Sequence, residues 1–180
     1  MKLLAWLLFF AAVASVRAQV RESALSEVEV EVLREKAPEP AERVLAFVGF
    51  LNDRTKAIEK LLLGRRKPGR EDDIHDLMEQ FSSIANDLQD NLDDYDKHHK
   101  DVRKALPKLL VATERWGTAL RSPADESAYN VSRKLALDAL ADVKASTSEM
   151  IKAQQEYFLA HPPPRDTGPG RPDERRGPTR

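Results

Sequence analysis

Acidic and imidazole side chains are concentrated in one short stretch, QDNLDDYDKHHKD, which spans residues 89–101. Residues 71–101 as a whole hold eleven acidic and two basic residues. Side chains three or four positions apart share one face of a helix, so Asp90, Asp94 and His98 can approach one another. Carboxylate and imidazole groups are suitable ligands for zinc, nickel or copper. This stretch is therefore a candidate site for a divalent metal or a small ligand.

The same stretch places polar side chains at heptad positions where Leu or Ile is usual. The candidate patch comprises Asn91, Asp94, Tyr95, His98 and His99. A structural alternative is a polar layer that sets the register of the helices, or a wet seam where the protein is thin. A metal site normally needs a third protein ligand, which the sequence does not identify. We therefore predict no bound metal or other cofactor.

Motifs for catalysis are missing from the sequence. It contains no nucleophile elbow, no HExxH and no phosphate-binding loop. The absence of Cys excludes disulfide scaffolds, Cys-ligated zinc, iron–sulfur clusters and thiol catalysis. The sequence therefore favours a protein that is not an enzyme.

A basic cluster, formed by Arg65, Arg66, Lys67 and Arg70, could contact an anionic surface such as lipid headgroups or a polyanionic polymer. The alternative is a solvated loop with no binding role. Nucleic acid is not an expected partner, because residues 19–160 carry 22 basic and 27 acidic residues and offer no aromatic platform for stacking bases.

The N-terminus has the pattern of an export signal. Lys2 precedes a largely apolar run of 14 residues, and small or modest residues stand at Val16 and Ala18. This pattern predicts a signal peptide, residues 1–18, cleaved after Ala18, because the run is too short for a membrane span. We expect a secreted or periplasmic protein with no transmembrane segment after cleavage.

Gly and Pro separate the apolar periodic segments. They predict a short helix over 22–36, a helix over 41–63, a long helix from 71 to about 121, and a last helix from 124 to 159. A heptad pattern across about 45 residues of the long helix predicts coiled-coil-like packing. Pro107 lies inside this pattern, so we expect a kink there; a break between Asp96 and Pro107 is the alternative.

Short connections at 64–70 and 121–123 predict antiparallel neighbours, with residue 98 near residue 146. The expected fold is all-α, an elongated antiparallel three- to four-helix bundle over 19–160, followed by a disordered Pro/Arg-rich tail over 161–180. The predicted function is contact with a protein partner or an envelope surface. The alternative is binding of a small ligand or divalent metal at the Asn91–His99 patch. The partner's identity and the oligomeric state stay open.

Overall fold

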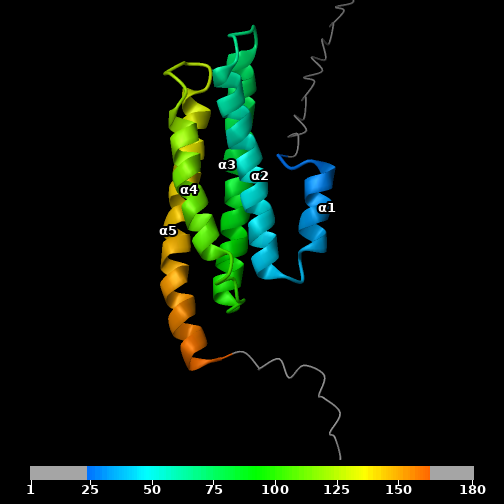
Figure 1. Ribbon diagram of the computed structural model, residues 1–180, viewed down its shortest axis with the longest axis vertical. Coiled ribbons are helices and arrows are strands. Elements are labelled where there is room, and N and C mark those ends of the chain that lie inside the picture. Colours follow the sequence, from blue (N-terminus) through cyan, green and yellow to red (C-terminus); the bar gives the residue numbers. More distant parts are fainter. Residues whose placement is uncertain (1–23, 163–180) are drawn as a thin grey trace, which may run out of the picture.

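The computed structural model describes residues 24–162, and all the regular secondary structure in this part of the chain is helical (Figure 1). Its five helices are α1 (Glu27–Glu35), α2 (Pro40–Leu63), α3 (Arg70–Lys97), α4 (Leu106–Arg121) and α5 (Asn130–Ala160). The all-α prediction is confirmed, as are the helices expected over 22–36 and 41–63. The predicted signal peptide, and the predicted tail from residue 163 onward, lie outside the described residues.

Helices α2 to α5 pack side by side, and α1 lies against the outer side of α2 (Figure 1). Both α2 and α5 pack against α3 and against α4, so the four helices share one core. α3 and α5 run in the same direction: Gln89 contacts Ser146 and His99 contacts Tyr157, which are separations of 57 and 58 residues.

The core consists of large apolar side chains from all four packed helices. The indole of Trp116 meets the ring of Phe81 edge-on at a centroid distance of 5.8 Å. The indole Nε1 of Trp116 donates a hydrogen bond of 2.9 Å to the Asn52 side chain, so its polar atom is satisfied. Other fully buried side chains are Phe47, Leu51, Ile58, Ile74, Met78, Ile84, Leu88, Leu92, Leu106 and Leu109.

One continuous helix over residues 71–121 was expected, and this is wrong. α3 ends at Lys97 and α4 begins at Leu106, so the alternative of a break between Asp96 and Pro107 is confirmed. Pro107 lies in the first turn of α4, where its missing N–H has no helical partner to lose. The proline therefore starts a helix here and does not kink one.

His99 stops α3 by adopting a left-handed conformation, with φ of 51°. The N–H of Lys100 donates to the carbonyl of Tyr95 at 2.8 Å, and the N–H of His99 donates to Asp96 at 3.1 Å. These two bonds form a Schellman motif, which usually has Gly at the left-handed position. Stacking of the imidazole on the ring of Tyr157, at a centroid distance of 3.9 Å, holds His99 in place.

Gln154 fixes the loop that follows. Its side-chain oxygen accepts a hydrogen bond of 3.1 Å from the N–H of Val102, and its Nε2 donates one of 2.8 Å to the carbonyl of Lys100. The Gln154 side chain is buried, so α5 provides hydrogen-bond partners for backbone groups of the loop that water does not reach. The loop then turns back into α4.

This reversal changes which residues are neighbours. The expected pairing of residue 98 with residue 146 is wrong, because it assumed that α5 runs antiparallel to a continuous long helix. The hydroxyl of Ser146 instead accepts a hydrogen bond of 2.8 Å from the amide of Gln89. The adjacent residue, Thr147, is buried, and its hydroxyl donates to the carbonyl of Val143 on its own helix.

The start of the last helix also differs from the expectation of residue 124. Ser122 ends α4, and α5 begins at Asn130. The buried ring of Tyr129 occupies the connection, and its hydroxyl donates a hydrogen bond of 2.7 Å to the carbonyl of Ala124. Burial raises the pKa of the Tyr129 phenol.

The expected polar gap in the heptad of α3 is not found. Leu88, Leu92 and Tyr95 form the buried stripe there, while Asn91 is only partly buried and His98 is exposed beyond the helix end. Leu88 and Tyr95 lie on the expected seam, but the buried position between them is Leu92, one residue after Asn91. Leu92 occupies the core position that was assigned to Asn91.

We predict that Leu92→Ala costs about 2–5 kcal/mol of unfolding free energy, because it leaves a cavity in the core. Asn91→Ala should cost no more than about 1.5 kcal/mol, since it removes hydrogen bonds at a partly exposed position. Urea denaturation followed by circular dichroism measures both values. The opposite order would contradict the register of α3.

We predict that Gln154→Ala costs about 1–3 kcal/mol, because it leaves buried backbone groups of the loop without partners. Hydrogen exchange at Val102 should accelerate in this variant. The neighbouring Gln155 is exposed, so Gln155→Ala is the matched control and should stay within about 0.5 kcal/mol of the parent protein. Equal losses in the two variants would show that the Gln154 amide does not hold the loop.

Candidate functional site

The structure divides the predicted Asn91–His99 patch into separate contacts. Asp94 and His98 meet at 3.0 Å between carboxylate and imidazole, with both side chains more than half exposed. The phenol of Tyr95 donates to the side chain of Asn91 at 3.3 Å, and burial raises the pKa of that phenol. His99 turns away and stacks on α5.

The Asp94–His98 pair supplies two metal donors. In the described residues 24–162, no group of three or more His, Asp or Glu side chains is arranged to hold a metal ion. Asp90, the remaining candidate ligand, lines a groove toward α1 and α2.

The predicted basic cluster lies in the loop between α2 and α3, and some of its charge is neutralised. The guanidinium of Arg66 pairs with Glu71 at 3.1 Å and with Glu126 at 3.6 Å. Arg70 pairs with Glu71 at 3.3 Å. Desolvation raises the pKa of the Glu71 carboxyl group, but a hydrogen bond from its own backbone N–H and the charges of Arg66 and Arg70 lower this pKa overall. Arg66 thus links two loops at one end of the molecule, while Arg65 and Lys67 are exposed.

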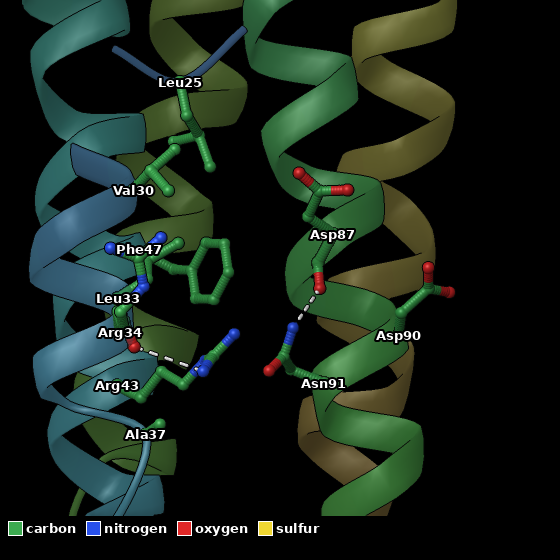
Figure 2. Close-up of a pocket in the computed structure, with 10 residues that line it drawn as sticks. All are labelled: Leu25, Val30, Leu33, Arg34, Ala37, Arg43, Phe47, Asp87, Asp90 and Asn91. Atoms are coloured by element: carbon green, nitrogen blue, oxygen red, sulfur yellow. Dashed lines mark hydrogen bonds between the residues drawn. The ribbon is translucent and has the colours of Figure 1, made fainter. Parts of the chain in front are cut away.

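A groove of about 470 Å³ lies between α1 and α2 on one side and α3 on the other (Figure 2). We call it the α1–α3 groove. Its volume is in the range of small-molecule and peptide sites. Apolar and basic side chains from the first two helices form one wall, and acidic and amide side chains of α3 form the other. The lining residues are Leu25, Val30, Leu33, Arg34, Ala37, Arg43, Phe47, Asp87, Asp90 and Asn91.

α1 forms part of this groove because two arginines of α2 hold it. Arg54 pairs with the carboxylate of Glu29 and donates a hydrogen bond of 2.8 Å to the carbonyl of Ala24. Arg43 donates one of 3.1 Å to the carbonyl of Leu33 near the end of α1. Ser26 begins the helix with a capping box to Glu29.

The carboxylates of the acidic wall form no ion pair with the basic side chains of the facing wall. Within residues 24–162, neither Asp87 nor Asp90 has an ion pair within 4 Å. Partial burial raises the pKa of Asp87, and the negative charge of Asp90 adds to this. Arg34, on the facing wall, pairs with Glu31 on its own helix. The groove therefore combines an apolar wall with carboxylates that have no cationic partner there.

Several residues of the groove were not predicted from the sequence. Leu33, Arg43 and Phe47 reach it only because α1 folds back on α2. One feature of the sequence did indicate an exposed apolar surface on the first helix. The valines at residues 28, 30 and 32 alternate, so a single helix face cannot bury all of them. Val28 and Val30 are indeed 73% and 38% exposed.

Comparison with protein-family models, with curated proteins and with solved structures found no match for this chain. None of the helices within residues 24–162 combines the length and the apolar character that a membrane span requires. The site therefore has to be interpreted from its own chemistry.

We predict that α1 loosens from α2 at acid pH. The hydrogen bond from Arg54 lowers the pKa of Glu29 below 4.5 in the folded protein, so the pair stabilises above pH 4.5 and this contribution is lost as pH falls through the lowered pKa. Hydrogen exchange of residues 27–35, corrected for the intrinsic rate, should rise over that window.

The Glu29→Gln variant should exchange faster already at pH 7 and lose this pH dependence. Glu27 is exposed on the same helix, so Glu27→Gln is the control and should behave like the parent protein. Identical exchange profiles for Glu29→Gln and Glu27→Gln would contradict the role of the Arg54–Glu29 pair.

Proposed function

We propose that this protein is an exported, non-enzymatic four-helix bundle that binds a protein partner through the α1–α3 groove. Export rests on the basic and apolar pattern of residues 1–18. The observation that carries the binding proposal is the pair of unpartnered carboxylates, Asp87 and Asp90, beside an apolar wall.

The chemistry of the groove favours a partner segment that is both apolar and basic. Leucine-sized side chains of the segment would pack on Leu25 and Val30, which are partly exposed apolar residues of the groove. Lysine or arginine side chains would pair with Asp87 and Asp90 across the opening. An amphipathic helix presents these two kinds of side chain on adjacent faces, which is a common way for a helix to dock in a groove.

Catalysis has little support at this position. The lining of the groove includes two carboxylates but no serine, histidine or lysine that could complete a nucleophile and base pair. Asp87 and Asp90 lie three residues apart on α3, and Figure 2 shows the carboxylate of Asp90 turned farther from α1 and α2 than that of Asp87. The two carboxylates are therefore better suited to binding a cationic partner than to catalysis.

The test uses a fluorescein-labelled 18-residue helical peptide made of leucine and lysine. A peptide of the same length made of leucine and glutamate is the control of opposite charge. Fluorescence anisotropy should show binding of the lysine peptide. Asp87→Asn with Asp90→Asn should weaken it about five- to tenfold, as expected for the loss of two partly exposed ion pairs.

Asp138 and Asp142 are exposed on α5, one helical turn apart, and provide the matched control. The double variant Asp138→Asn/Asp142→Asn removes the same charge and should bind the lysine peptide like the parent protein. The proposal is wrong if the lysine peptide does not bind, if both peptides bind equally, or if the control variant loses as much affinity as the groove variant.

A further inference from the structure

A second cavity lies where the end of α3 faces α5. It has a volume of about 440 Å³ and lies between the last turn of α3 and the last turns of α5. We call it the end groove. Aromatic rings and two carboxylates line it: His99, Tyr157, Phe158, Asp96 and Glu156.

Aromatic side chains are packed in a fixed order at this end. Tyr157 stacks with His99 at a centroid distance of 3.9 Å and with His161 at 4.5 Å, with interplanar angles of 14° and 20°. Phe158 meets the edge of Tyr157 at 5.1 Å. The guanidinium of Arg103 lies 4.3 Å over the Phe158 ring. His99 and His161 therefore cover both faces of Tyr157, and Arg103 covers one face of Phe158.

The carboxylates of the end groove have no cation of their own. Asp96 and Glu156 are exposed, and neither forms an ion pair among the described residues. Arg103 lies over Phe158 at this groove, but its guanidinium pairs with Asp101 and not with Asp96 or Glu156. An aromatic surface edged by free carboxylates is suited to a segment that contains both proline and arginine, because proline packs on aromatic rings and arginine pairs with carboxylates.

The chain carries such a segment close to the end groove. Residues 169–176 read PGRPDERR, with two prolines, three arginines and two acidic residues, so the arginines are in excess by one. His161 is held against Tyr157, so the chain leaves α5 at the rim of the groove. The six residues 163–168 can span roughly 19 Å at about 3.1 Å per residue, and they include Asp-Thr-Gly, which suits a turn.

We propose that residues 169–176 of the same chain dock in the end groove, with Pro172 on the aromatic rings and the arginines on Asp96 and Glu156. The short connection raises the effective concentration of the segment to the millimolar range, so weak contacts are sufficient. A second copy of the chain could supply the same segment, but it would have to compete with this tethered one. This docking is independent of the α1–α3 groove.

The test is paramagnetic relaxation on the full chain labelled with ¹⁵N. The sequence contains no Cys, so Thr179→Cys offers one site for a nitroxide spin label. Amide signals of residues 96–99 and 153–158 should be broadened strongly. Those of residues 65–69, at the far end of the molecule, should be unaffected.

Tethering alone brings the label near this end, so a matched variant sets the baseline. Asp96→Asn with Glu156→Gln removes the two carboxylates at exposed positions and leaves the tether unchanged. The relaxation enhancement at residues 96–99 should fall about threefold to fivefold in this variant, as expected for two exposed ion pairs.

Three outcomes would overturn the proposal. Equal broadening in the parent protein and the carboxylate variant would mean that the segment is only near the groove. Stronger broadening at residues 87–91 would place the segment in the α1–α3 groove. Broadening that appears when ¹⁵N-labelled protein without the spin label is mixed with unlabelled protein carrying it would assign the occupant to a second copy.

Discussion

The two hydrogen bonds from the Gln154 side chain to the loop after α3 are the contacts on which the packing of this protein depends. They bind the carbonyl of Lys100 and the N–H of Val102 in a buried position, and so keep the chain reversed between α3 and α4. Without this reversal, α4 would continue away from α3. With it, the four helices α2 to α5 enclose a single core that includes Trp116 and Phe81.

The sequence was sufficient to predict the helical class and the extent of α2, because apolar spacing and flanking Pro and Gly agree there. It did not predict the end of α3, because a histidine, His99, takes the left-handed position where glycine is usual. Its stabilising partner, Tyr157, lies 58 residues away, so local pattern cannot reveal it. The register error at Leu92 has a similar origin, since two adjacent heptad stripes on α3 are both apolar over most of its length.

The candidate site was only partly predictable for the same reason. The acidic stretch of α3 was recognised, and Asp90 and Asn91 do line a groove. Its apolar wall comes from α1 and α2, which face α3 only after the chain has folded back at Pro40. Arg54 and Glu29, which hold α1 in position, are 25 residues apart and have no recognisable motif. A metal site was the natural inference from residue types, but the fold leaves Asp94 and His98 as an isolated pair and turns His99 toward Tyr157.

The parallel course of α3 and α5 has an electrical consequence. Each helix carries a partial negative charge of about half an elementary unit at its C-terminus, from carbonyl groups that have no helical partner. Both C-termini lie at the His99 end of the molecule, next to each other, whereas α2 and α4 present their N-termini there. That end is therefore divided into a negative half and a positive half by the backbone alone. Because this effect falls off within the last turn of a helix, it acts on charged groups that contact that end directly.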